Sequence, residues 1–552
     1  MRHTYRYVLA LGVAVSLGCR VENAEIQRGL NAISAAELAQ KIQVLAADSM
    51  EGRAPSSAGE DKTVNYLVDQ FRQLGLRSGS GEAYVQQVPL VSIAADRNMT
   101  LAVQGPGKVT SLTYGDQFVA FTSRVAERVG IQNSELVFVG YGIVAPEYGW
   151  NDFAGVDVKG KTIVVLVNDP GYATSDTTLF KGRTMTYYGR WTYKYEEAAR
   201  QGAAGVLIVH ETEPAGYPWE VVTGSWSGTR FALESEDDNL SRAAVEGWMT
   251  ADVARQLFRD AGMDYDSLKA RASQRVFKAV PLGLRASLTI RNTLHRSASR
   301  NVLAVLPGTT RADEYVIYMA HWDHLGRDTT LQGDQIYNGA LDNASGVAGL
   351  LELAKAYAAL DRNPARSVLF LAVTAEEQGL LGSQYYAAHP VYPLNKTVAA
   401  INLDGMNIFG PMRDITVVGY GNSELDDYVV EAAEGQKRVV RPDPEPEKGF
   451  YFRSDHFPLA KVGVPALDPD GGTNSVEHGE AWTRQQRDAF TAQRYHKPAD
   501  EYDSAWDLGG AMEDLRLFFR VGYRLANEET FPNWRPGTEF KAARDGMMGR
   551  SQ

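Results

Sequence analysis

Acidic and imidazole side chains recur in this chain directly after short apolar segments. They lie in AHWDHLG, GALDNASG, TAEEQGLLGS, INLDGMN and RYHKPADE, which contribute His321, Asp323, Asp342, Glu376, Glu377, Asp404 and His496. Three of these segments are preceded by apolar, β-branched runs: YVIYMA before His321, SVLFLAV before Glu376 and VAAINL before Asp404. Such runs are typical of buried strands in a parallel sheet, and in open α/β sheets chemistry gathers beyond the carboxyl ends of the strands. We therefore expect one site at this edge of a sheet.

The residue types at this edge suit zinc. Zinc binds imidazole nitrogen and carboxylate oxygen, and a catalytic site keeps one position open for water or substrate. Two zinc ions about 3.5–4 Å apart need a shared carboxylate, and we expect Asp342 to be this bridge because it lies in a tight loop directly before an apolar helical segment. His321 and Asp404 complete the set for one ion, and Glu377 and His496 complete it for the other.

The remaining residues of these loops have supporting roles. Asp323 lies two residues beyond His321 and is expected to be the carboxylate that fixes the imidazole tautomer. Adjacent residues at a strand end point in different directions, so Glu376 is expected to face the attacking water while Glu377 binds metal. Glu376 is then the general base that takes the proton from the water and delivers it to the leaving amine. His324 is expected to be a hydrogen-bonded wall residue.

In their order, these residues resemble metallopeptidase family 28, which includes bacterial leucyl aminopeptidases and the glutamate carboxypeptidase II group. Three further segments are similar to that family: LAADSMEGRAPSSAGEDKTVNYLVDQFRQLGL, GFYFRSDHFPLAKVGVPAL and NWRPGTEFKAARD. The resemblance implies an α/β fold with a mixed, mostly parallel sheet sandwiched by helices, two zinc ions and peptide substrates. It also implies a cis peptide bond between Asp342 and Asn343, and substrate contacts from Tyr451, Asp455 and His456.

A chain of 552 residues is long enough for two or more domains. Residues 107–283 have shorter strands with many glycine and aromatic turns, and they resemble a protease-associated domain. That domain is expected to be inserted between two parts of the zinc peptidase domain, residues 26–106 and 284–552. The alternative is a second globular domain of unknown role.

The amino-terminal residues predict export. Arg2 and Arg6 precede an apolar stretch that ends at Gly18, followed by Cys19, the only cysteine, so residues 1–19 are expected to be a signal peptide. The position of Cys19 resembles a bacterial lipoprotein cleavage site, and ordinary signal cleavage is the alternative. We expect a periplasmic or outer-membrane-anchored lipoprotein, or a secreted protein, whose only link to a membrane is a lipid anchor at Cys19. The net charge of −12 disfavours a nucleic-acid partner.

The expected activity is that of an exported aminopeptidase, and three alternatives remain. A carboxypeptidase or dipeptidase would need a basic pocket for the substrate carboxylate, for which Arg453 is a candidate. A glutaminyl cyclase resembles this family but binds a single zinc ion, and such a site has no need for both His321 and Asp404. A non-catalytic receptor or scaffold on the same fold typically loses ligands, whereas every ligand position is filled here.

Overall fold

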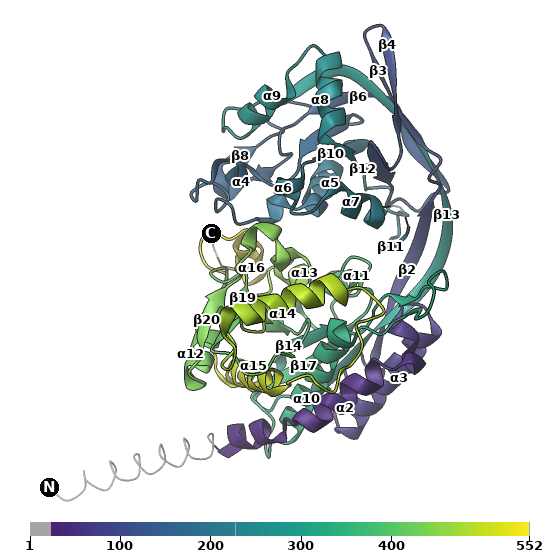
Figure 1. The fold of residues 1–552 in the computed structure, drawn as a ribbon. Coiled ribbons are helices and arrows are strands. Elements are labelled where there is room, and N and C mark those ends of the chain that lie inside the picture. The colour runs from purple at the N-terminus through teal and green to yellow at the C-terminus, as the bar shows by residue number, and fades with distance from the viewer. Residues whose placement is uncertain (1–23, 227, 551–552) are drawn as a thin grey trace, which may run out of the picture. The chain divides into compact units, whose positions relative to one another are not determined.

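The computed structural model describes residues 24–226 and 228–550, which form two compact units (Figure 1). The first unit comprises Met1–Val88, Ser299–Asp443 and Ser454–Gln552, and the second comprises Pro89–Ala298 and Pro444–Arg453. The boundaries expected at residues 107 and 283 fall inside the second unit. The short segment Pro444–Arg453 returns to the second unit, which the sequence did not lead us to expect.

A mixed sheet forms the centre of the first unit. Its strand order is β1–β13–β17–β14–β18–β21–β19–β20. Strand β14 is parallel to both β17 and β18, and β18 is parallel to β21, which confirms the predicted mixed, mostly parallel sheet. The strand bounds are β1 (Arg77–Ser78), β13 (Val280–Leu306), β14 (Arg311–His321), β17 (Arg366–Val373), β18 (Thr397–Asn402), β19 (Asp414–Val418), β20 (Val439–Pro442) and β21 (Ala466–Asp470).

Both faces of the central strands of this sheet are buried. In β14 the side chains of Val316, Tyr318 and Ala320 point into one large apolar core, while Ile317 and Met319, which are equally buried, point to the opposite face. Burial on both faces explains why the strands are almost continuously apolar. The helices that contribute to the large core are α2 (Ala35–Leu45), α3 (Ala58–Gln73), α10 (Gly346–Ala358), α12 (Leu425–Gly435) and α15 (Gly509–Asn527).

Other helices of this unit complete the fold. Helix α13 (His456–Lys461) contacts β18 and β21, and α11 (Leu381–Ala388) contacts α13. The chain also forms α14 (Gly479–Gln493) and α16 (Lys541–Met547). In the part of the chain that the structure describes, no helix is both long and apolar enough to cross a membrane.

The first helices of the unit begin at serine caps. The hydroxyl of Ser34 accepts a hydrogen bond from the backbone N–H of Glu37 at the start of α2, and Ser57 does the same for Gly59 and Glu60 at the start of α3. Helix α3 ends before Gly75, whose φ of +72° is the left-handed conformation that favours glycine. These two helices therefore fix the position of the 3₁₀ segment between them, Asp48–Arg53, which supports the site described below.

The second unit has its own sheet and core. Its strand order is β4–β3–β13–β6–β9–β10–β12–β5, and β11 pairs with β2. Helix α5 (Trp191–Arg200) leads into the fully buried strand β10 (Gly205–His210). The other helices and strands are β2 (Val85–Ala95), β3 (Thr100–Gly105), β4 (Lys108–Thr113), β5 (Phe118–Phe121), β6 (Arg128–Phe138), β7 (Val144–Ala145), β8 (Trp150–Asn151), β9 (Thr162–Leu166), β11 (Thr229–Leu233), β12 (Val245–Thr250), α4 (Pro170–Thr174), α6 (Thr212–Ala215), α7 (Trp219–Trp226), α8 (Ala251–Asp260) and α9 (Tyr265–Ala272). Its identity as a protease-associated domain stays a prediction.

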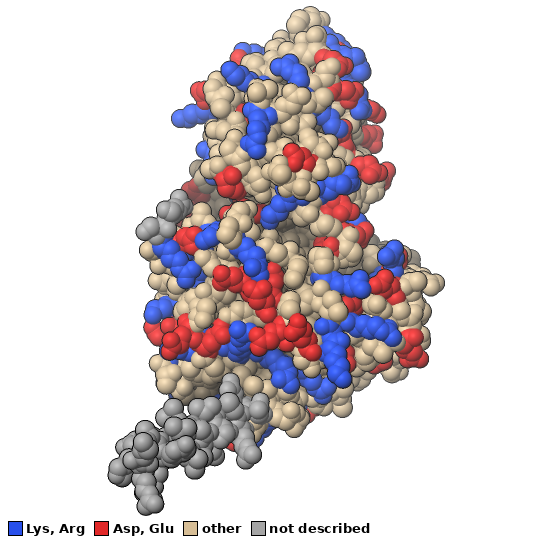
Figure 2. All heavy atoms as spheres, turned by 90° about the vertical axis from the view of Figure 1, so that its left-hand side faces the viewer, with Lys and Arg blue, Asp and Glu red and all other residues tan. Residues whose placement is uncertain are grey.

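The surface carries charges of both signs. On the face drawn in Figure 2, lysine and arginine side chains lie among aspartate and glutamate side chains. The excess of acidic residues, 68 against 56 basic ones, favours solubility.

Candidate metal centre

Three of the expected site residues follow neighbouring parallel strands. His321 is the last residue of β14, Glu376 comes shortly after β17, and Asp404 comes shortly after β18. In the sheet register His321 is opposite Val373, the last residue of β17, and Met319 is opposite Asn402, the last residue of β18. Because β14 lies between the other two strands, these residues meet at one edge of the sheet.

The first group of metal-type ligands contains His321, Asp342 and Asp404. The Nε2 atom of His321 lies 3.3 Å from Oδ1 of Asp342 and 3.2 Å from Oδ1 of Asp404. Burial by itself lowers the pKa of His321, but Asp404, Glu376 and Asp342 together raise it well above its ordinary value. The surroundings of this imidazole are therefore strongly negative.

The second group contains Asp342, Glu377 and His496. The Nε2 atom of His496 lies 3.1 Å from Oδ2 of Asp342 and 3.1 Å from Oε2 of Glu377. Asp342 thus presents one oxygen to each group, as a bridging carboxylate must. His324, Asp342 and Glu377 also form a set of metal-type side chains that lie together, in which Nδ1 of His324 lies 2.6 Å from Oε1 of Glu377.

The donor atoms fit zinc. Tetrahedral zinc with bonds of about 2.0–2.2 Å separates its ligand atoms by about 3.3–3.5 Å, and the four separations between a histidine nitrogen and a carboxylate oxygen in the two groups are 3.1–3.3 Å. Among the described residues, Asp342, Glu377 and Asp404 form ion pairs with histidine and with no lysine or arginine. Carboxylates gathered in a buried position are costly without a cation, so the set is suited to hold metal.

Comparison with known proteins gives the family. A family model described as "Peptidase family M28" matches residues 301–519, the segment that contains all six residues from His321 to His496 to which metal binding or base catalysis was assigned. This segment belongs to peptidase family M28. A solved structure, "Aminopeptidase from Aneurinibacillus sp. strain AM-1", is similar to this chain with a TM-score of 0.50 and 20% identity, over 92% of this chain and 97% of that chain. The mixed, mostly parallel α/β fold predicted from the sequence is confirmed.

Curated relatives of this chain match over shorter spans. "Aminopeptidase NAALADL1" of Mus musculus is 35% identical over 129 residues, which are 22% of this chain and 16% of that protein. "Probable glutamate carboxypeptidase AMP1" of Arabidopsis thaliana is 25% identical over 367 residues, which are 62% of this chain and 47% of that protein. The chain thus spans about a sixth of the first relative and just under half of the second.

The loop that carries Asp342 is held from two directions. The carboxylate of Asp500 accepts hydrogen bonds from the backbone N–H groups of Leu341 (3.0 Å) and Asp342 (3.1 Å). The Asp342–Asn343 peptide bond is cis, as the resemblance implied. The buried amide of Asn343 donates to Leu403 O and accepts from Gly405 N. Asn343 therefore ties the bridging carboxylate to the loop of Asp404 without being a ligand itself.

Arg53 is a buried support of the M28 site that sequence reasoning missed. Its guanidinium donates hydrogen bonds to four backbone carbonyls, those of Leu45, Trp322, Asn338 and Gly339, at 2.6–2.9 Å. Trp322 follows His321, and Asn338 and Gly339 precede Asp342, so one side chain joins both ligand loops. Burial lowers the pKa of Arg53 to about 10, opposed by Asp500 and Asp342, so the group stays charged at neutral pH.

The two adjacent glutamates differ in their surroundings. Burial, together with nearby Glu377 and Asp404, raises the pKa of Glu376 well above its ordinary value, although His321 opposes this. Burial would also raise the pKa of Glu377, but hydrogen bonds from His324 and His496 hold it below the ordinary value. Glu376 is therefore suited to carry a proton, and Glu377 to remain an anionic ligand.

Asp323 supports the site in a way that was not expected. The Nδ1 atom of His321 lies 3.2 Å from the backbone carbonyl of Asp323 and 3.9 Å from its carboxylate. The carboxylate oxygen Oδ1 accepts instead from the backbone N–H of Glu376, at 3.0 Å. The carbonyl is thus the nearer partner of the imidazole, while the side chain fixes the backbone of the expected base.

The expected substrate contacts are divided between the two units. Asp455 and His456 are fully buried in the first unit, where Asp455 accepts a hydrogen bond from Ser383 and His456 lies 3.5 Å from Asp468. Tyr451 belongs to the second unit and packs edge-on against Phe452. Their role in substrate binding stays a prediction, and Cys19 lies outside the described residues.

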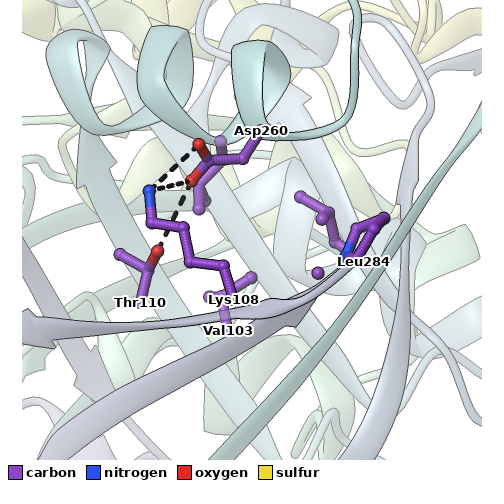
Figure 3. A pocket seen from close by; sticks show the side chains of 8 residues that line it. Val103, Lys108, Thr110, Asp260 and Leu284 are labelled. Atoms are coloured by element: carbon purple, nitrogen blue, oxygen red, sulfur yellow. Dashed lines mark hydrogen bonds and ion pairs between the residues drawn. The ribbon is translucent and has the colours of Figure 1, made fainter.

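A separate pocket in the second unit has a different character. It has a volume of about 100 Å³ and is lined by Val103, Leu257 and Leu284, with an ion pair of 3.0 Å between Lys108 and Asp260 at its side (Figure 3). Thr110 also donates to Asp260. Because the charges of this pocket neutralise each other and no imidazole lines it, the catalytic candidate is the centre around Asp342.

Proposed function

We propose that this M28 chain is an exported di-zinc aminopeptidase that hydrolyses amino-terminal residues from peptides. One observation carries the proposal: the two oxygens of Asp342 face two different imidazoles, those of His321 at 3.3 Å and His496 at 3.1 Å. Asp404 completes the first group and Glu377 the second. Each group then has three protein donors, and a zinc ion bound there keeps a position open for water or substrate.

The chain's own residues supply the proton transfers. Bound zinc polarises the scissile carbonyl and lowers the pKa of water. Glu376 takes one proton from the attacking water and gives it to the leaving amine, so the carboxylate is restored at the end of each cycle. Asp323 holds the backbone of Glu376 in place through the 3.0 Å hydrogen bond.

A carboxylate that bound metal does not neutralise would support specificity for a free amino terminus. Such a group can form a charge-assisted hydrogen bond with a positively charged α-ammonium group. A carboxylate near the metals would hold that group while the first peptide bond is hydrolysed.

The test is a panel of aminoacyl-anilides beside amino-terminally blocked peptides, assayed with and without a chelator. We expect hydrolysis of the unblocked substrates, loss of activity with chelator and recovery with zinc. Hydrolysis of the blocked peptides alone would contradict the proposal. Conversion of glutaminyl substrates to a cyclic product without hydrolysis would instead indicate a cyclase.

A carboxypeptidase is the second candidate, and one observation favours it. The match to the Arabidopsis protein named a probable glutamate carboxypeptidase covers 62% of this chain. That activity requires a basic group for the substrate carboxylate, and Arg453 in the second unit is the candidate. Release of carboxy-terminal residues from blocked peptides, lost in Arg453→Met, is the result that this candidate predicts.

Two parts of the proposal concern the rest of the chain. Residues 1–19 are proposed to direct export, with Cys19 as a lipid-anchored amino terminus in the periplasm or at the outer membrane. The second unit is proposed to be a protease-associated domain that limits which peptides are accepted. Deletion of residues 1–19 should retain the protein in the cytoplasm.

A further inference from the structure

His324 is a fully buried histidine to which no metal-binding or catalytic role is assigned above. It follows Asp323 in the loop after β14 and is 0% exposed. Its ring lies edge-on to the ring of His496, with 5.8 Å between the centroids. A Cβ atom on Gly339 would come within 2.5 Å of its Cδ2 atom, so this glycine leaves the space that the ring occupies.

One distance distinguishes His324 from the metal-type ligands. Its Nδ1 atom lies 2.6 Å from Oε1 of Glu377, whereas the Nε2 atoms of His321 and His496 lie 3.1–3.3 Å from the carboxylate oxygens of their groups. Two atoms bound to one tetrahedral zinc ion are about 3.3–3.5 Å apart. A separation of 2.6 Å is that of a charge-assisted hydrogen bond, so His324 and Glu377 Oε1 are bonded to each other and do not share an ion.

The bonding of the two ring nitrogens agrees with this. Among the described residues Nε2 of His324 has no hydrogen-bond partner, which leaves Nδ1 as the bonded nitrogen. Because a carboxylate oxygen only accepts, Nδ1 carries the hydrogen and donates it. The other oxygen of Glu377, Oε2, lies 3.1 Å from His496 Nε2 and remains available to metal.

We propose that His324 is a positioning residue that divides the Glu377 carboxylate: it engages Oε1 and reserves Oε2 for the metal held with His496 and Asp342. Glu377 is then a one-oxygen ligand, which keeps a coordination position open for water or substrate. The inference rests on the metal-binding part of the proposed function and is independent of peptidase activity. Partners that orient zinc ligands in this way typically change metal affinity by about 10- to 100-fold.

The test uses three substitutions of His324 that place a donor differently. In His324→Asn the amide nitrogen occupies the position of Nδ1, in His324→Gln it occupies that of Nε2, and His324→Ala has no donor. Zinc is titrated into each apoprotein against a competing chelator, and the unfolding temperature of each apoprotein verifies folding. His478→Asn is the matched control, because His478 is 42% exposed and carries no role in the site.

We expect His324→Ala and His324→Gln to weaken binding of the second zinc by about 10- to 100-fold, and His324→Asn to stay within a few-fold of wild type. If His324 binds zinc directly, Asn is as poor as Ala, since an amide is a poor zinc ligand, and the proposal is overturned. Unchanged zinc affinity in all three variants overturns it as well. The expected zinc pattern without any peptidase activity would contradict only the proposed function.

Discussion

Exchanging each of the two adjacent glutamates for glutamine separates the base from the ligand. Glu376 has a raised pKa and Glu377 a lowered one, so the two substitutions should fail in different ways. Glu376→Gln is expected to retain zinc and substrate affinity while kcat falls by about 10² to 10⁴. Glu377→Gln is expected to lose zinc from the group that contains His496.

The size of the second effect follows from the contacts of Glu377. Its Oε1 accepts from His324 at 2.6 Å and its Oε2 faces His496 at 3.1 Å. A glutamine amide has one oxygen and one NH₂. Its oxygen can satisfy either His324 or the metal position beside His496, and its NH₂ then places a donor against the other. A lost hydrogen bond to a charged group costs about 1.5–3 kcal/mol, which corresponds to about 10- to 150-fold weaker zinc binding.

The assay measures kcat, KM and zinc content for both variants over a series of free zinc concentrations. Excess zinc should restore part of the activity of Glu377→Gln, because the weakened site is refilled. It should not restore Glu376→Gln, because no added metal replaces a proton acceptor. Rescue of Glu376→Gln alone would reverse the two roles. Full turnover in both variants would show that this centre is not the active site.

Three further predictions concern other parts of the chain. In a Gram-negative host the wild type should partition with membranes, and Cys19→Ser should become soluble or remain unprocessed; equal partitioning would contradict lipidation. Arg53→Met leaves four carbonyls without their donor. At about 1–3 kcal/mol for each unsatisfied buried group, it should lower the free energy of unfolding in urea by at least about 4 kcal/mol. A loss below about 1 kcal/mol would contradict the support assigned to Arg53. Burial raises the pKa of Asp514 to about 6, opposed by Arg438, so only the folded state binds this proton between about pH 4 and 6. The contribution of Asp514 to the free energy of unfolding should therefore fall by up to about 3 kcal/mol as the pH rises through this window. Asp514→Asn should remove that dependence, and urea unfolding with the same pH slope as wild type would contradict it.

The strands that carry the site could be predicted from the sequence because both of their faces are buried. Burial requires continuous apolar, β-branched runs, and polar residues of metal-binding type directly after such runs are visible in the sequence. The cluster around Asp342 follows from these strands, since His321 is the last residue of β14 and Asp404 comes shortly after the neighbouring strand β18.

The supports of the site could not be predicted in the same way. Arg53 reaches carbonyls 269 to 286 residues away, and no local pattern marks such a contact. The spacing of Asp323 from His321 suggested a bond between their side chains, but the carboxylate reaches the backbone of Glu376. The sequence predicted His324 only as a wall residue of the site. Its 2.6 Å contact with Glu377, seen only in the structure, distinguishes it from the other histidines.

Zinc content per chain tests the bridged centre most directly. Metal analysis of the purified mature protein should find close to two zinc ions, and Asp342→Ala should fall clearly below that value because both groups lose a shared ligand. Asp334→Ala, in the exposed part of the preceding loop, should retain the wild-type content. A single zinc ion in the wild type, or unchanged zinc content in Asp342→Ala, would contradict the account.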